Sequence, residues 1–294
     1  MVQAVEATQD QAGPRLWRAL RGLALACHPG PTVVVTGLAT ALAAAVGAGP
    51  TTVVLVALAV LSGQLSVGWS NDWIDARRDL AVGRTGKPVV AGLVGAQTLR
   101  AAALAAVAVC VPASLAASAV GGSLHLVAVA SAWAYNARLK ATVWSWLPYA
   151  LSFGLLPLFV VLAAPGDRVA APWVVGAAAL LGAGAHVANT LPDLADDAAT
   201  GVRGLPHRLG RRVSGVLAPV LLLSAVAVVL TGPDAAPGRL AWACGVLAAL
   251  LAVGAGVVAV ERPSSRAPFG LSMAVAVVCL VLLALAAPDA AVTV

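Results

Sequence analysis

Apolar stretches separated by short polar segments recur along almost the whole chain. Most are about 18 to 22 residues long, which is the length of a helix that crosses a hydrocarbon core of roughly 30 Å. The pattern predicts an all-α polytopic membrane protein, with residues 1–28 as an N-terminal lead-in and residues 29–294 as one transmembrane domain. The predicted membrane-spanning helices number about nine and lie near 31–49, 52–70, 99–117, 119–135, 146–164, 171–189, 213–231, 240–260 and 268–287.

Composition supports this fold class. Hydrophobic residues make up 61% of the chain, charged residues make up 10%, and the mean hydropathy is +0.94. A water-soluble domain of 294 residues does not need so much apolar surface, because burial in a single core saturates well below it. The four cysteines are far apart and form no CxxC or Cys/His cluster, so disulfide, zinc and redox functions have little support.

The net charge of +6 follows membrane topology rather than nucleic-acid binding. With the N-terminus placed in the cytoplasm, the predicted cytoplasmic segments carry all but two of the 18 Lys and Arg residues. Only Arg168 and Arg239 fall on the other side. This is the distribution that the positive-inside rule describes. We therefore expect a multi-pass protein of the cell (inner) membrane, with a cytoplasmic N-terminus, membrane lipid around it and no nucleic-acid partner.

Two acidic segments share one spacing. In each, an Asn and two Asp stand at i, i+4 and i+8, so the three side chains lie on one face of a helix. A Gly follows the Asn by twelve residues in both segments, and a Pro follows it by seventeen. The matched positions, at a constant offset of 118 residues, are Asn71 and Asn189, Asp75 and Asp193, Asp79 and Asp197, Gly83 and Gly201, and Pro88 and Pro206. This predicts a duplicated helix-plus-loop unit whose two copies face each other across a shared cavity.

Carboxylates gathered beside a bilayer need a counter-charge. Two of them 4 Å apart repel by about 4 kcal/mol at an effective dielectric constant near 20, so protonation, arginines or divalent cations must offset the repulsion. Asp and Asn oxygens suit Mg²⁺, which shares its coordination shell with substrate phosphates. The nearby Arg84, Lys87 and Arg203 would be redundant for a bare metal site. They fit a diphosphate, whose oxygens bind the metal while Lys and Arg hold the rest.

These residues resemble the signatures of a known family. The stretch Asn71-Asp-Trp-Ile-Asp75-Ala-Arg-Arg-Asp79, followed by Gly83-Arg84-Thr-Gly-Lys87-Pro88, closely resembles the first signature of the UbiA superfamily of intramembrane prenyltransferases. The stretch from Asp193 to Gly210 is similar to the second signature, and Tyr135-Asn-Ala-Arg138-Leu-Lys140 resembles an element that lies between them. The three matches cover nearly the whole chain in the order of the family.

The resemblance implies a helical bundle around a central cavity with a Mg²⁺-dependent isoprenyl diphosphate site. The metal ligands that it implies are Asp72, Asp75, Asp79, Asp193 and Asp197. The diphosphate-binding residues that it implies are Asn71, Arg84, Lys87, Lys140, Asn189 and Arg203. The catalytic residues are expected to be Asp72, Asp75, Asp193 and Asp197.

Three positions depart from the family pattern. Pro192 stands where many members carry Arg, Gly204 replaces a common Thr, and His28-Pro29 occupies the place of a common Arg-Pro. The diphosphate site is expected to survive these changes, whereas the acceptor subfamily stays open.

The resemblance implies transfer of an isoprenyl group from a prenyl diphosphate to a small lipid-soluble, aromatic acceptor, with release of diphosphate. The alternative is a terpene cyclase of the same superfamily, which ionises the same diphosphate and closes the cation on its own double bonds. A metal-independent transporter or lipid-binding protein is the third class.

Overall fold

The protein is described by a computed structural model that covers residues 16–262, 264–286 and 290–293. The first fifteen residues of the predicted lead-in lie outside the described part. The long helices are α2 (Pro29–Ala45), α3 (Pro50–Ala81), α4 (Ala96–Ala117), α5 (Ala119–Ala137), α6 (Leu147–Ala163), α7 (Pro172–Thr190), α9 (Leu205–Thr231), α10 (Arg239–Glu261) and α11 (Ala267–Leu285). Shorter elements are β1 (Arg168–Ala170), α8 (Leu194–Ala199), β2 (Ala291–Thr293) and the 3₁₀ helices Leu139–Ala141, Val143–Trp146 and Leu191–Asp193.

The all-α membrane fold is confirmed. Each predicted span coincides with one long helix among the described residues, and seven of these helices are long and apolar enough to cross a membrane. An eighth span results if α2 is joined to the preceding helix Leu16–Ala26, from which it is bent by 63°. Helix α5 falls short because His125, Tyr135 and Asn136 lower its hydropathy. The predicted count of about nine is therefore approximate.

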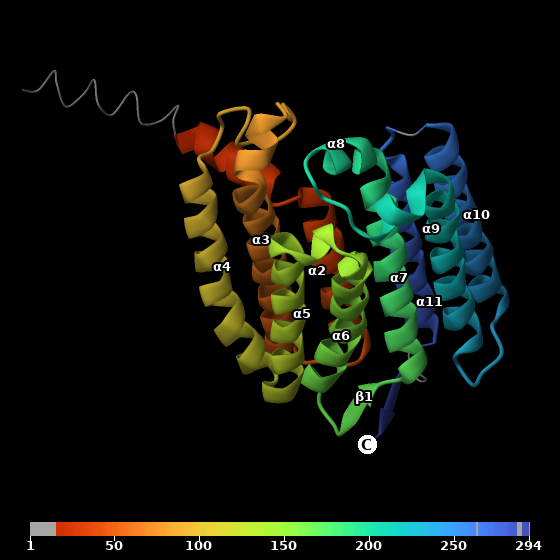
Figure 1. Cartoon of the computed structure of the whole chain (residues 1–294). Coiled ribbons are helices and arrows are strands. Elements are labelled where there is room, and N and C mark those ends of the chain that lie inside the picture. The colour runs from red at the N-terminus through yellow and green to blue at the C-terminus, as the bar shows by residue number, and fades with distance from the viewer. Residues whose placement is uncertain (1–15, 263, 287–289, 294) are drawn as a thin grey trace, which may run out of the picture.

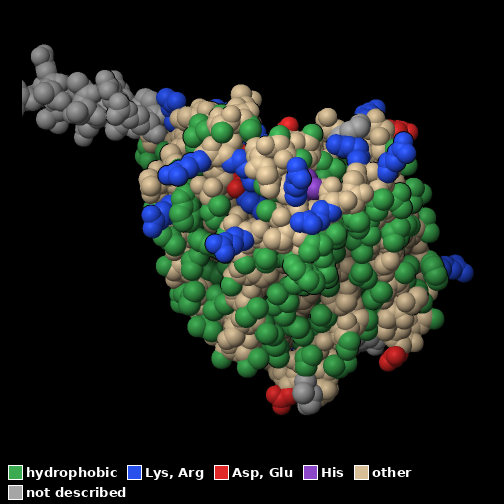
Figure 2. All heavy atoms as spheres, in the orientation of Figure 1, with side chains coloured by type: hydrophobic (Ala, Val, Ile, Leu, Met, Phe, Trp, Pro, Cys, Tyr) green, Lys and Arg blue, Asp and Glu red, His purple; other side chains and the backbone are tan. Residues whose placement is uncertain are grey.

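The long helices lie side by side in one bundle (Figure 1). Lys and Arg side chains gather at the end that carries α8, above a broad hydrophobic belt (Figure 2), and we call this the charged end. At the opposite end β1 and β2 form a small antiparallel pair with Arg168 opposite Thr293. Arg168, one of the two basic residues predicted to lie on the other side, is thus remote from the charged end.

Helix α3 ends in a Schellman motif at Gly83. This glycine has a φ of +65°, a conformation that costs little only without a Cβ atom. The N–H of Gly83 donates to the carbonyl of Leu80 at 3.3 Å, and the N–H of Arg84 donates to the carbonyl of Asp79 at 3.1 Å. The motif satisfies carbonyls at the helix end and turns the chain back over the bundle.

The second acidic segment ends in the same motif at Gly201, where φ is +83°. The N–H of Gly201 donates to the carbonyl of Ala198 at 3.2 Å, and the N–H of Val202 donates to the carbonyl of Asp197 at 2.8 Å. Each of these residues is offset by 118 from its counterpart at the end of α3. The predicted duplication therefore extends to individual backbone hydrogen bonds.

The two copies differ in continuity. Helix α3 runs unbroken through its acidic segment, whereas α7 stops at Thr190 and continues as a 3₁₀ turn and the six-residue α8. Pro192 lies in that turn. Proline has no backbone N–H to donate, and its ring clashes with the preceding turn of a regular α-helix. The first acidic segment is consequently buried within a helix, while the second folds over the charged end.

The N-terminal helix is held closely against α3. Trp69 Nε1 donates to the carbonyl of Leu23 at 2.9 Å, and a Cβ atom on Gly68 would lie 2.7 Å from the carbonyl oxygen of Cys27. The next residue, His28, has a left-handed backbone with φ of 54° and separates the two bent helices. The absence of a side chain at position 68 is thus what allows this backbone to approach α3.

We expect Gly68→Ala to destabilise the protein by about 1–3 kcal/mol, because the new methyl group overlaps backbone atoms. Gly254→Ala in α10 is the matched control, since its Cβ would meet no atom within 4 Å. That change should be neutral or stabilising by up to about 1 kcal/mol. Thermal unfolding midpoints of the purified variants measure the difference. Equal midpoints for Gly68→Ala and the unmodified protein would contradict the close approach.

Candidate active site

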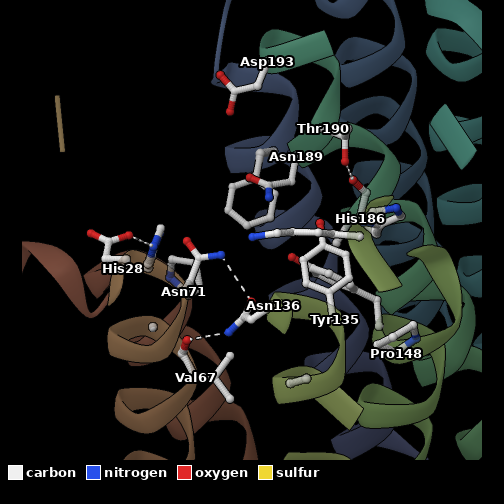
Figure 3. A pocket seen from close by; sticks show the side chains of 18 of the residues that line it. His28, Val67, Asn71, Tyr135, Asn136, Pro148, His186, Asn189, Thr190 and Asp193 are labelled. Atoms are coloured by element: carbon white, nitrogen blue, oxygen red, sulfur yellow. Dashed lines mark hydrogen bonds and ion pairs between the residues drawn. The ribbon is translucent and has the colours of Figure 1, made fainter. Parts of the chain in front are cut away.

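A cavity of about 880 Å³ lies inside the bundle. Its wall is formed by α2, α3, α5, α6, α7 and α11, with the segments that follow α3 and α7 at the charged end. Figure 3 shows this region, with Asn71 and Val67 of α3 facing Asn189 and Asp193 of the α7 segment. The cavity is polar and charged at this end and mainly apolar below it, where aliphatic and aromatic side chains line the wall.

The carboxylates of α3 are buried and paired with cations, most of which come from outside the helix. Asp72 Oδ1 accepts from Lys87 Nζ at 2.6 Å and lies 3.3 Å from His28 Nε2. Asp75 Oδ1 accepts from Lys140 Nζ, and its Oδ2 accepts from Arg78 at 2.9 Å. These ion pairs offset the desolvation that burial imposes on each carboxylate. Segments far from α3 in the sequence are thereby fixed over its end.

Burial lowers the pKa of Lys140, while the adjacent Asp75 carboxylate and the hydrogen bond to it act in the opposite direction. The ammonium group is thus held in place chiefly by its carboxylate partner. A ligand that brings more negative charge to this position would bind the same ammonium group without any new cation.

Arg84 joins the two acidic segments. Its guanidinium donates to Asp197 Oδ1 at 2.8 Å and forms an ion pair with Asp79 Oδ1 at 3.5 Å. Burial opposes the charge of Arg84, but the hydrogen bond and charge of Asp197 prevail and raise the pKa of the guanidinium. Asp79 is almost fully buried, and its Oδ1 has no hydrogen bond to any described residue. The copies of the duplicated unit are therefore bridged by one cation.

His207 supports Asp197 from the other side. The backbone N–H of Gly204 donates to His207 Nδ1 at 3.1 Å, so in the neutral ring the proton lies on Nε2. That nitrogen faces Asp197 Oδ2 at 3.7 Å. The glycine at position 204 is required here, because a Cβ atom would lie 2.7 Å from both the Lys140 carbonyl and Ser145 Oγ. This explains the departure from the Thr of the family pattern.

Asp193 is more open than the other four predicted metal ligands. Its side chain is 29% exposed, and its partner Arg266, at 3.4 Å, is 79% exposed. Exposed ion pairs of this kind contribute little to stability. Of the predicted metal ligands, Asp193 is therefore the one most available to an incoming ligand.

Amides complete the polar end. Asn71 Nδ2 donates to Asn136 Oδ1 at 3.2 Å, and Asn136 Nδ2 donates to the carbonyl of Val67 at 2.9 Å, as Figure 3 shows. The contact with Asn136 uses only the Nδ2 donor of Asn71. The Oδ1 atom of Asn71 therefore remains available to a ligand.

The donor set fits a hard divalent cation. Asp and Asn oxygens are the ligand atoms that Mg²⁺ prefers, and the buried Asp79 Oδ1 receives no hydrogen bond from the part of the chain that the structure describes. Among the described residues, no three Asp, Glu, His or Cys side chains gather as a ready metal site, since basic residues pair with the carboxylates instead. These oxygens therefore suit an ion that arrives with a ligand able to complete its coordination shell.

Most of the predicted site residues meet in the cavity wall. Those that line it are Asn71, Asp72, Asp75, Arg84, Lys87, Lys140, Asn189, Asp193 and Asp197. Asp79 lies behind Arg84 rather than in the wall, and Arg203 is exposed outside it.

Sequence reasoning missed two residues of the site. His207 could have been found as the third residue after Gly204 at a helix start, the spacing of a capping box. Asn136 lies in the Tyr135–Lys140 element, but the resemblance implies no function for it. Its pairing with Asn71 depends on the packing of α5 against α3.

Comparison with known proteins places the chain among membrane enzymes. The model of the UbiA prenyltransferase family matches residues 32–278. No curated protein matches the chain. Among solved structures, the apo structure of a UbiA homologue from Aeropyrum pernix K1 is 22% identical with a TM-score of 0.71, and the match covers 86% of this chain and 96% of the homologue.

Two further solved structures have the same fold. A UbiA homologue from Archaeoglobus fulgidus bound to GPP and Mg²⁺ is 16% identical with a TM-score of 0.67, covering 89% of this chain and 99% of the homologue. A digeranylgeranylglyceryl phosphate synthase is 15% identical with a TM-score of 0.63, covering 92% and 98%. At these identities the likeness establishes the fold.

We expect Arg84→Gln to destabilise the protein by about 2–3 kcal/mol, because Asp79 and Asp197 lose their shared cation in a largely buried setting. The control is Arg77→Gln on the exposed side of α3, which should change stability by less than about 0.5 kcal/mol. Thermal unfolding of both variants measures this. Equal losses would show that Arg84 does not bridge the two copies.

Proposed function

The chain belongs to the UbiA prenyltransferase family, and we propose that it is a Mg²⁺-dependent intramembrane prenyltransferase. It transfers an isoprenyl group from a prenyl diphosphate to a small lipid-soluble, aromatic acceptor and releases diphosphate. One observation carries this proposal: carboxylates and cations from both copies of the duplicated unit converge at one end of a cavity whose remainder is mainly apolar. A prenyl diphosphate has the same division into a charged head and a hydrocarbon tail.

The cations of the site are assigned to the diphosphate. Lys87, Lys140 and Arg84 each contact a carboxylate and line the cavity. Their side chains can therefore donate hydrogen bonds to phosphate oxygens without a rearrangement of the backbone. As the C1–O bond breaks, its electron pair passes to the diphosphate, and preorganised donors lower the energy of that developing charge. Arg203, which is exposed, is assigned a role only in drawing the anionic head toward the site.

The carboxylates are assigned to the metal. Asp72, Asp75, Asp193 and Asp197 present oxygens to the cavity, and Asp79 contributes from behind Arg84. When bound, Mg²⁺ would neutralise the diphosphate and make it a better leaving group. Asn71 and Asn189 supply neutral oxygens from the two sides of the same space.

Relatives support the donor class and the ion. The homologue from Archaeoglobus fulgidus has been solved bound to GPP and Mg²⁺ and bound to DMAPP and Mg²⁺. We extend both ligand classes to this chain because its carboxylates and cations converge in the same family fold. We also propose that the charged end faces the cytoplasm in the cell membrane, as the positive-inside rule predicts, with residues 29–294 acting as one domain.

Asp75→Ala should lower turnover at least about 10²-fold, the scale for losing a key electrostatic stabiliser. The assay follows diphosphate release from geranyl diphosphate with Mg²⁺ and a phenolic acceptor. Asp167→Ala removes the same charge from an exposed position near β1, at the opposite end, and should leave turnover unchanged. A folded Asp75→Ala variant with near-normal turnover would overturn the assignment.

Chelation by EDTA should abolish transfer, and added Mg²⁺ should restore it. With geranyl diphosphate and Mg²⁺ but no acceptor, we expect no cyclic product by gas chromatography. A cyclic hydrocarbon formed without acceptor would instead identify a terpene cyclase. Transfer that persists in EDTA would exclude the metal-dependent mechanism.

A further inference from the structure

The N-terminal helix, Leu16–Ala26, has three different faces. At about 100° per residue, its positions fall into three groups that point roughly 120° apart around the helix axis. One group packs against the bundle, one is exposed and apolar, and one is exposed and basic. Leu25 departs from this division, since it lines the cavity beside the bend. The groups are, in that order, Ala19, Gly22, Leu23 and Ala26, then Leu16, Trp17, Leu20 and Ala24, then Arg18 and Arg21.

The packed face fixes the rotation of the helix about its axis. A Cβ atom on Gly22 would lie 2.8 Å from the Cβ atom of Val94, so the two backbones approach closely. Leu23 and Ala26 pack with Val94 in a small hydrophobic core that also contains Trp69 and Trp73. The apolar and basic faces are therefore directed away from the bundle.

The apolar face carries large side chains. Leu16 is 60% exposed, Trp17 is 72% exposed and Leu20 is 45% exposed. The helix lies at the charged end, where Figure 1 draws it in red next to the grey trace, and it is bent by 63° from α2. A helix that lies across the end of a bundle and exposes Leu and Trp is typical of the membrane interface, where such side chains reach the acyl chains.

The basic face lacks counter-charges. Arg18 and Arg21 are neighbours at i and i+3, and Arg18 Nη2 lies 3.5 Å from the carbonyl oxygen of Gly92. Arg100 of α4 lies over the ring of Trp73, 5.5 Å from its centroid, and Trp73 belongs to the same small core as the N-terminal helix. Within the described part of the chain, none of these three arginines forms an ion pair with a carboxylate. They differ in this from Arg84, Lys87 and Lys140.

We propose that the N-terminal helix binds an anionic phospholipid in the membrane interface. Arg18, Arg21 and Arg100 contact its headgroup. Leu16, Trp17 and Leu20 lie among the upper carbons of its acyl chains. An anionic lipid matches both exposed faces at once, because its headgroup neutralises the arginines while its hydrocarbon covers the apolar side chains. A soluble anion would match the basic face alone, and a lipid without net charge would leave the arginines uncompensated.

Bound lipid would also support the first acidic segment. His28 follows the N-terminal helix at the bend, and its Nε2 lies 3.3 Å from Asp72 Oδ1. The lipid would thus hold the helix that positions His28 beside this carboxylate, without itself entering the cavity.

Quenching of Trp17 fluorescence tests the proposal. The full-length protein is placed in nanodiscs of one composition, in which one lipid in five is phosphatidylglycerol and the rest is phosphatidylcholine. In one preparation the phosphatidylglycerol carries brominated acyl chains, and in the other an equal amount of phosphatidylcholine carries them. Subtracting the emission of Trp17→Phe isolates the signal of Trp17. We expect brominated phosphatidylglycerol to quench Trp17 at least about twofold more strongly, because anionic lipid is enriched at the arginines.

The double variant Arg18→Gln, Arg21→Gln should make the two lipids quench equally. Each arginine at an anionic surface is expected to raise lipid affinity about fivefold, so removal of two abolishes most of the preference. The matched control is Arg208→Gln, Arg212→Gln, which removes the same charge from exposed positions of α9 at the same end of the molecule. It should leave the preference for phosphatidylglycerol unchanged.

Three results would overturn the proposal. Equal quenching by the two lipids in the unmodified protein would show that the helix does not select anionic lipid. Absence of quenching by either lipid would show that protein or water, rather than hydrocarbon, covers Trp17. Equal loss of the preference in both double variants would show a general attraction of anionic lipid to the charged end instead of a site on this helix.

Discussion

Compensation of buried carboxylates is the constraint on which the rest of the structure depends. Helix α3 carries three almost fully buried aspartates at the end of an apolar span. An uncompensated charge in such a place is very unfavourable. The compensating cations come from two connecting segments: Arg84 and Lys87 follow α3, and Lys140 follows α5. Arg84 also reaches Asp197 in the segment after α7. These segments fold over the charged end because their side chains are required there.

The same pairs prepare the site for an anion. Arg84, Lys87 and Lys140 are already largely desolvated and oriented by their carboxylates. A diphosphate with a divalent ion can therefore exchange partners with these groups at little cost in ordering. The duplicated unit supplies these oriented groups from both sides of the cavity. Its copies have diverged at Pro192, which breaks the second helix and leaves Asp193 partly exposed. The first copy is thus a buried, rigid face, while the second is open to the incoming head group.

The hydropathy pattern was sufficient to predict the long helices, because spans of this length depend on local composition alone. The matched spacing of glycine and proline is also reflected in the structure, where Gly83 and Gly201 form equivalent turns. A Schellman motif depends only on a residue that tolerates a positive φ. The left-handed His28 and the 63° bend beside it could not be predicted, because they follow from the contact of Cys27 with Gly68, forty-one positions along the chain. Asn136 was missed for the same reason, because its role arises from a tertiary contact between helices. The position of His207 at the start of α9 is visible in the sequence, but its contact with Asp197 is not.

Polarity along the cavity decides which chemistry it can hold. At the charged end, carboxylates and cations nearly balance, so the site is suited to an anion that brings its own metal. Deeper in the bundle, none of the described Lys and Arg residues lines the wall, and most side chains there are aliphatic or aromatic. A carbocation formed between these two regions would meet apolar walls and aromatic rings rather than bulk water. Such a cation would therefore be protected from hydrolysis until an acceptor reaches it.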